Sequence, residues 1–127
     1  MRVVVDSNVY RALRDQVHHN AAREILEELS EWITPTLVIY EVVWTLRNKL
    51  GNDPALEYTS ALLTHRKLVI VSATKDDIMR AIQTIKDEKT SLARFNDKLL
   101  LAIAKRLKIP LLTFDKQLIT QATRVGC

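Results

Sequence analysis

Four acidic side chains stand beside segments that the sequence predicts to be buried. A carboxylate in such a place is costly unless it is paired, hydrogen-bonded or bound to a metal ion. The four are Asp6, Glu41, Asp97 and Asp115. The other eleven acids lie in openly polar contexts, of which Asp76-Asp77 is an example. Four carboxylates that converge on one point would form a site for a hard divalent cation.

Asp6 and Asp115 each follow a short apolar run that reads as a strand. In open parallel sheets, ligands bind beyond the carboxyl ends of the strands, so both acids are expected at one edge of the sheet. Each acid also has a purely local interpretation. Asp6 could cap a turn beside Ser7 and Asn8, and Asp115 could lie in a first helical turn with Thr113 as its N-cap.

Glu41 interrupts the almost wholly apolar stretch 37–46. Together with Thr45 and Asn48 it follows the spacing of one narrow polar stripe on a helix. A helix so apolar on its remaining surface is expected to be buried, and its polar stripe would then line a cleft. The alternative is that the stripe only meets bulk solvent.

Asp97 opens the apolar segment 99–107 and falls in the first turn of a predicted helix, where an acid is favourable in any case. Surface pairing with Arg94 or Lys98 would also satisfy it. Taken singly, each of the four acids has an ordinary explanation. Their joint arrangement, at boundaries of the core in distant parts of the chain, is what points to one site.

The pattern of apolar residues predicts alternating strands and helices. The predicted strands are Arg2–Val5, Trp32-Ile33, Leu68–Val71 and Leu111-Leu112. The predicted helices cover 21–29, 35–50, 53–64, 75–87 and 96–108, with a polar connection at 89–94 and a short last helix from Phe114. Thr34 is predicted as an N-cap with Pro35 in first helical position, Gly51 as a helix end, and Thr74 with Asp77 as a capping box. Such alternation predicts an α/β fold, a three-layer α/β/α arrangement around a mainly parallel central sheet, in one domain of residues 1–127.

Composition agrees with a soluble globular domain, because 47% of the 127 residues are hydrophobic and 27% are charged. No apolar run is long enough to span a membrane, and no signal peptide precedes the first strand. The only cysteine is Cys127, so the sequence predicts neither a disulfide framework nor a thiolate metal site. A cytoplasmic location is the resulting expectation.

Charge is distributed unevenly along the chain. Residues 89–127 contain eight basic and two acidic residues, a net charge of +6, whereas residues 1–88 carry −2. This asymmetry suggests a polyanionic partner. The alternative is that Lys105, Arg106 and Lys108 only favour the C-terminus of a helix.

Other chemistries find less support in the sequence. His18, His19 and His65 do not follow a metal-ligand spacing, although a His18/His19 acid–base pair acting on RNA without metal is conceivable. There is no glycine-rich phosphate loop and no nucleophile elbow. Haloacid-dehalogenase-type phosphatases need a second Asp where this chain has Asn8, and receiver-type domains need a pair of acids after the first strand.

Three segments resemble the motifs of PIN domains. They are Val3-Val4-Val5-Asp6-Ser7-Asn8, the stretch 34–42 with Glu41 in mid-helix, and the closing stretch 95–115 with Asp97 and Asp115. The likeness spans nearly the whole chain, and the small size is like that of VapC-type toxins of toxin–antitoxin pairs.

The resemblance implies a Mg²⁺- or Mn²⁺-dependent endoribonuclease. Asp6, Glu41 and Asp97 would be the main cluster, Asp115 a supporting fourth acid, and Asn8 and Thr113 would orient the cluster. RNA, a cognate antitoxin protein and a homodimer are the implied partners, and the helix that carries Trp44 could help form the dimer. The last strand of such a fold would be short or missing. The alternative is a PIN-like scaffold that binds RNA or protein without cleaving.

Overall fold

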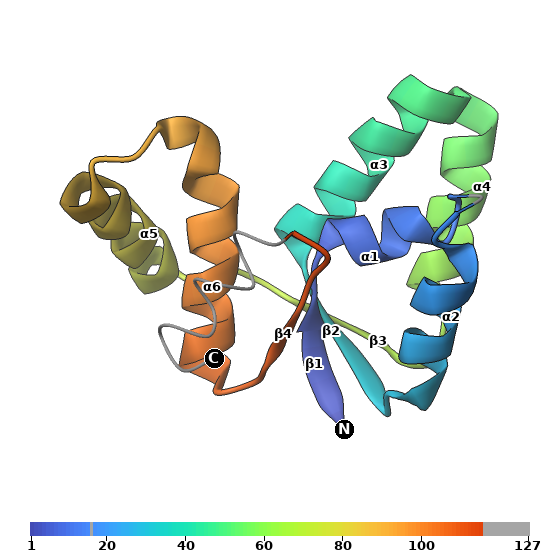
Figure 1. Ribbon diagram of the computed structural model, residues 1–127, viewed down its shortest axis with the longest axis horizontal. Coiled ribbons are helices and arrows are strands. Elements are labelled where there is room, and N and C mark those ends of the chain that lie inside the picture. The colour runs from blue at the N-terminus through green and yellow to red at the C-terminus, as the bar shows by residue number, and fades with distance from the viewer. Residues whose placement is uncertain (16, 116–127) are drawn as a thin grey trace.

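The structure, a computed structural model, describes residues 1–15 and 17–115 (Figure 1). Its sheet has four parallel strands in the order β3-β2-β1-β4. They are β1 (Arg2–Val5), β2 (Glu31–Pro35), β3 (Leu68–Val71) and β4 (Leu111–Leu112). The predicted parallel α/β sheet is confirmed. The first strand lies between two others, which explains why Val4 and Val5 are fully buried.

Helices cover both faces of this sheet, as Figure 1 shows. On one side lie α1 (Ser7–Ala12), α2 (His19–Glu28), α3 (Thr36–Leu50) and α4 (Asn52–Leu63). On the other lie α5 (Lys75–Glu88) and α6 (Phe95–Leu107), joined through a 3₁₀ turn at Leu92–Arg94. The expected three-layer arrangement is therefore present. No described helix is long and apolar enough to cross a membrane.

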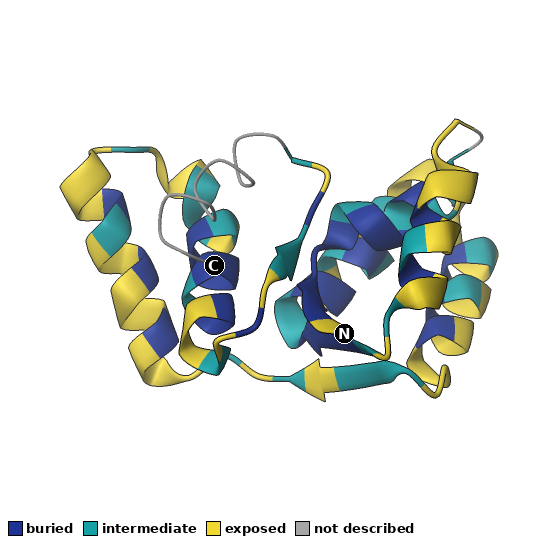
Figure 2. Ribbon diagram, turned by 60° about the horizontal axis from the view of Figure 1, so that its bottom comes forward, coloured by how far each residue is buried: buried dark blue, intermediate teal, exposed yellow. Residues whose placement is uncertain are grey.

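Burial follows the layers, with the inner faces of the helices covered and their outer faces exposed (Figure 2). The larger core cluster joins β1 to α1, α3 and α6, and includes Val9, Val42 and Leu100. A smaller cluster around Ala81 and Ile103 holds α5 against α6. This packing places the start of α6, which carries Asp97, beside the carboxyl end of the sheet. Asp6 and Asp115 follow strands that end at the same edge.

Several local predictions are confirmed. Helix α3 ends at Gly51, whose φ of 92° lies in the region that a side chain disfavours. The capping box of Thr74 and Asp77 opens α5 with both reciprocal hydrogen bonds. The short helix expected from Phe114 onward falls almost entirely outside the described residues.

The predicted N-terminus of α3 is wrong. Thr34 does not cap the helix, because Thr34 and Pro35 belong to β2 and the helix begins at Thr36 without a side-chain cap. The Thr34 hydroxyl instead lies in the core, 2.7 Å from the Tyr10 hydroxyl and 2.9 Å from the Trp32 carbonyl oxygen. A buried partner available only in the tertiary structure has replaced the local one.

Two other expectations need correction. Helix α1, directly after β1, was not predicted, because its six residues are too few to show a clear apolar period. Helix α3 is not buried all round either, since Tyr40 and Trp44 expose 63% and 60% of their surface. These two aromatic side chains lie on the face of α3 that the described residues leave open.

Candidate functional site

Asp6 lies between the end of β1 and the start of α1, and only 7% of it is exposed. One carboxylate oxygen accepts a hydrogen bond from the Ser7 backbone N–H at 2.7 Å. The other accepts from the Thr113 hydroxyl at 2.8 Å. Asp6 therefore caps α1, as the local interpretation of this residue expected. Its second oxygen also binds Thr113, which directly follows the neighbouring strand β4.

Thr113 is the centre of a small polar network that joins α1 to the end of β4. Its hydroxyl accepts from the Asn8 side-chain amide at 3.1 Å and from the Asp115 backbone N–H at 3.1 Å. The side-chain amide oxygen of Asn8, Oδ1, in turn accepts from the Phe114 backbone N–H at 3.1 Å. The network leaves the hydroxyl proton directed at Asp6, which fixes the orientation of that carboxylate.

Glu41 faces the same region from α3. Burial raises the pKa of its carboxyl above the ordinary value, and the negative charges of Asp6 and Asp97 raise it further. A side-chain hydrogen bond from Asn96 and the positive charge of Arg11 act in the opposite direction. The carboxylate is thus held in a place where its charge is only partly compensated.

Asp97 lies in the first turn of α6, and Arg94 pairs with it at 3.2 Å, as the local interpretation expected. Burial nevertheless raises the pKa of Asp97, and the charges of Asp115 and Asp6 contribute in the same direction against Arg94. Lys98 is buried and pairs with Glu88 at 2.6 Å, and its charge also lowers the pKa of Asp97.

The four acids thus act on one another electrostatically from four elements of the chain. The negative charges of Asp6 and Asp97 raise the pKa of Glu41, and those of Asp6 and Asp115 raise the pKa of Asp97. Within the described residues, however, no group of three acids or histidines lies close enough to ligate one ion directly. The three histidines have other contacts. His18 pairs with Asp15, His19 Nδ1 lies 2.6 Å from the Leu13 carbonyl oxygen, and His65 stacks on Trp32.

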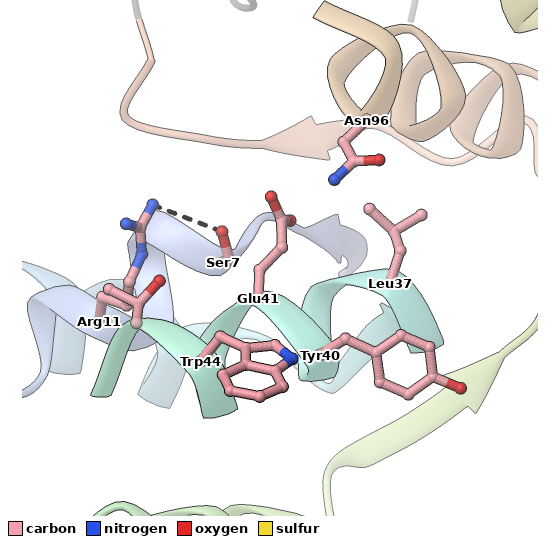
Figure 3. Close-up of a pocket in the computed structure, with 8 residues that line it drawn as sticks. Ser7, Arg11, Leu37, Tyr40, Glu41, Trp44 and Asn96 are labelled. Atoms are coloured by element: carbon pink, nitrogen blue, oxygen red, sulfur yellow. Dashed lines mark hydrogen bonds between the residues drawn. The ribbon is translucent and has the colours of Figure 1, made fainter. Parts of the chain in front are cut away.

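A pocket of about 390 Å³ opens beside Glu41, between α1, α3 and the start of α6 (Figure 3). Its polar lining comes from Ser7, Arg11, Thr45 and Asn96, and its apolar lining from Leu37, Tyr40 and Trp44. The polar stripe of α3 therefore does line a cleft at Glu41 and Thr45, while Asn48 is exposed.

Sequence reasoning missed Arg11, Ser7 and Asn96 as neighbours of Glu41. Figure 3 shows their side chains directed toward the same space as the Glu41 carboxylate. Arg11 and Ser7 could have been found only if α1 had been predicted, since a helix places residues four apart on one face. Asn96 was adjacent in sequence to Asp97, and that proximity was the available signal.

Several basic residues of the C-terminal segment form ion pairs within the protein. Arg106 contacts Asp77 at 3.0 Å and the Ser72 carbonyl oxygen at 3.2 Å, and Lys98 and Arg94 form the pairs described above. Lys89, Lys105 and Lys108 remain exposed. The excess of positive charge in this part of the chain is therefore weaker evidence for a polyanionic partner than the sequence suggested.

The sequence matches the PIN domain over residues 3–123, and the chain belongs to this family. A comparison with curated protein sequences gave no match.

Solved structures share the fold at low sequence identity. Mycobacterium tuberculosis VapC20, a toxin that cleaves the sarcin–ricin loop, has a TM-score of 0.80 at 19% identity, with 94% of each chain covered. A chain of a Klebsiella pneumoniae toxin–antitoxin complex has a TM-score of 0.65 at 17% identity, covering 89% of this chain and 86% of that one. A chain of Rickettsia felis VapBC2, bound to a DNA fragment from its promoter, has a TM-score of 0.68 at 10% identity, covering 92% and 90%.

Proposed function

We propose that the protein is a metal-dependent endoribonuclease that hydrolyses phosphodiester bonds of RNA, and that it is the toxin of a VapBC-type pair. The observation that carries the proposal is the mutual electrostatic effect of Asp6, Glu41, Asp97 and Asp115 at the carboxyl end of the sheet. Membership of the PIN family supports it, as does the likeness to VapC20 and to chains of the Klebsiella pneumoniae toxin–antitoxin complex and of VapBC2.

The donor set suits Mg²⁺ or Mn²⁺, because it consists of carboxylate oxygens with a hydroxyl and an amide oxygen nearby. Among the described residues no three acids could ligate one ion together, and this is compatible with Mg²⁺, which keeps several waters and takes only one or two carboxylates directly. Asp6, Glu41 and Asp97 would hold the ion, directly or through water, and Asp115 would support them. When bound, the ion would supply Lewis acidity toward water and the phosphate oxygens.

The protein's own residues would position this chemistry. Thr113 and the Ser7 N–H fix the Asp6 carboxylate through its two oxygens, and Asn8 fixes Thr113. Second contacts of this kind hold a ligand in one orientation and commonly change metal affinity or activity about 10- to 100-fold when removed. Burial is the main cause of the raised pKa values of Glu41 and Asp97, and repulsion from neighbouring acids adds to it; a bound cation would offset both effects.

An antitoxin protein and a second copy of the chain are the partners we propose, with the cytoplasm as the place of action. An RNA-binding scaffold without cleavage is the alternative function.

The decisive experiment is cleavage of several single-stranded and structured RNAs with Mg²⁺ or Mn²⁺, with and without chelator. Asp6→Asn and Asp97→Asn should each lower the cleavage rate at least about 100-fold, because each removes a charge that holds the ion. Asp87→Asn, an exposed acid that accepts a hydrogen bond from Gln83, is the matched control and should cleave normally.

Cleavage that survives both the chelator and the two substitutions would contradict the metal mechanism. Binding of RNA without cleavage of any substrate, by a protein shown to be folded, would favour the scaffold.

A further inference from the structure

Arg11 has an unsatisfied donor next to the acidic cluster. Its Nε is buried and has no hydrogen-bond partner among the described residues, and within them its Nη2 donates a hydrogen bond to the Ser7 hydroxyl at 3.4 Å. No acid of the described residues lies within ion-pair distance of its guanidinium. A buried N–H without a partner is costly, and a guanidinium keeps its charge at all ordinary pH values. The Arg11 charge acts on Glu41 electrostatically, but no carboxylate of the described residues pairs with it directly, so its guanidinium can still bind a further anion.

Arg11 also lies between two pockets. The first is the pocket beside Glu41, and the second, of about 430 Å³, is lined among others by Asn8, Lys49 and Phe114. Arg11 and Thr45 line both, so the two pockets are neighbours that meet at these side chains. Each volume lies within the range of small-molecule binding pockets.

Each pocket offers a ring or a flat apolar surface beside polar groups. Tyr40 and Trp44 line the first pocket, on successive turns of α3 (Figure 3). Phe114 lines the second pocket, where the positive charge of Lys49 stands beside the negative charge of Asp15. Aromatic side chains stack on bases of single-stranded nucleic acids, and basic side chains contact the phosphates between them. The order of groups is therefore aromatic, cationic, aromatic.

We propose that Arg11 binds the phosphate that joins two nucleotides of single-stranded RNA, one in each of these pockets. The inference rests on the proposed function, because that phosphate would be the one presented to Glu41 and Asp6. A guanidinium can give two parallel N–H bonds to a phosphate, and Nε is one of the donors in such a pair. Arg11 is thereby a substrate-binding residue of the site and not a metal ligand.

The test measures binding of a short fluorescein-labelled single-stranded RNA by anisotropy over a series of salt concentrations, with EDTA present to prevent cleavage. Each phosphate contact to a single strand contributes about 0.7 to the slope of log K against log salt. Arg11→Gln should reduce the slope by about 0.7 and the affinity about tenfold. Arg14→Gln is the matched control, because Arg14 is exposed on the next turn and lies over Tyr58; it should change neither quantity.

A role limited to holding Glu41 or Ser7 in place would alter the melting temperature of Arg11→Gln and leave its salt slope unchanged. That result overturns the inference. Arg11→Lys keeps the charge, so it should keep the slope while losing affinity severalfold with the bidentate contact.

A measurement on the wild-type protein tests the inference even if the Arg11 variants do not fold. In its NMR spectrum, the Arg11 Nε–H resonance should shift when a dinucleotide with a non-cleavable linkage is added in EDTA, and the Arg14 resonance should not. Absence of the shift overturns the inference. If RNA is cleaved but neither effect is found, only this inference fails. If both effects are found without any cleavage, the proposed nuclease fails and RNA binding through Arg11 stands.

Discussion

Two regions of this protein contain acids that are buried or partly buried, and the pKa values of these acids are shifted in opposite directions. Asp77, at the interface of α5 and α6, is fully buried, and both of its carboxylate oxygens accept hydrogen bonds. Arg106 pairs with it at 3.0 Å, and Thr74 completes a capping box with it. Burial alone would raise the pKa of Asp77, but the Arg106 and Thr74 hydrogen bonds outweigh it and hold that pKa below the ordinary value.

At the carboxyl end of the sheet the balance is reversed. Glu41 and Asp97 have raised pKa values, because burial and neighbouring acids outweigh their cationic and amide partners. The sequence placed Asp77 among the openly polar acids, and that was wrong. Burial of an acid therefore does not by itself mark a functional site. An acid whose partners leave its charge uncompensated is the stronger candidate.

Asp77→Asn tests the structural half of this contrast and should have the largest effect on folding. Loss of a buried charge with a partly exposed partner is expected to lower the free energy of unfolding by about 2 kcal/mol, measured by urea denaturation. Because the pKa of Asp77 is lowered in the folded state, its contribution is present above the unfolded value of 3.8 and is lost as pH falls through the folded value.

The stability difference between wild type and Asp77→Asn should therefore shrink in acid. Asp76→Asn is the control, since Asp76 is exposed and pairs only with exposed Arg80. A variant Asp77→Asn as stable as Asp76→Asn at neutral pH would show that the α5–α6 ion pair is not structural.

Addition of Mn²⁺ tests whether the acids at the carboxyl end of the sheet bind a metal ion. An ion that binds only the folded state stabilises it by about 1.4 kcal/mol when its free concentration is ten times Kd. The melting temperature of the wild type and of Asp77→Asn should rise with Mn²⁺, measured by calorimetry, and that of Asp6→Asn should not. An equal rise in Asp6→Asn would place the ion elsewhere.

Glu41→Gln should have the smallest effect and an opposite sign. The raised pKa of Glu41 means that its charge destabilises the folded state above the folded pKa, and that this penalty disappears below the unfolded value of 4.5. In metal-free buffer the variant should melt a few degrees higher than wild type near neutral pH, with no gain in acid.

Glu57→Gln, an exposed acid of the next helix, is the control and should not change the melting temperature. A Glu41→Gln variant that melts below wild type at neutral pH would show that the carboxylate is well compensated.

Much of this fold could be predicted from short-range pattern. The apolar strands, the Gly51 helix end and the capping box at Thr74 depend on neighbours in sequence, and all are present. The cap predicted at Thr34 failed because the hydroxyl has a partner on Tyr10, far along the chain. Helix α1 was missed because one and a half turns carry too little periodicity.

The candidate site divides in the same way. The sequence by itself selected Asp6, Glu41, Asp97 and Asp115, since an acid beside an apolar run is visible without coordinates. Only the tertiary structure decided which buried acids are compensated, because Arg106 reaches Asp77 across 29 residues of chain and Thr113 reaches Asp6 across 107. It also placed Arg11 between two pockets, with an Nε that has no hydrogen-bond partner among the described residues. Compensation of charge depends on distances between chain-distant groups, and these are set by packing and not by local sequence.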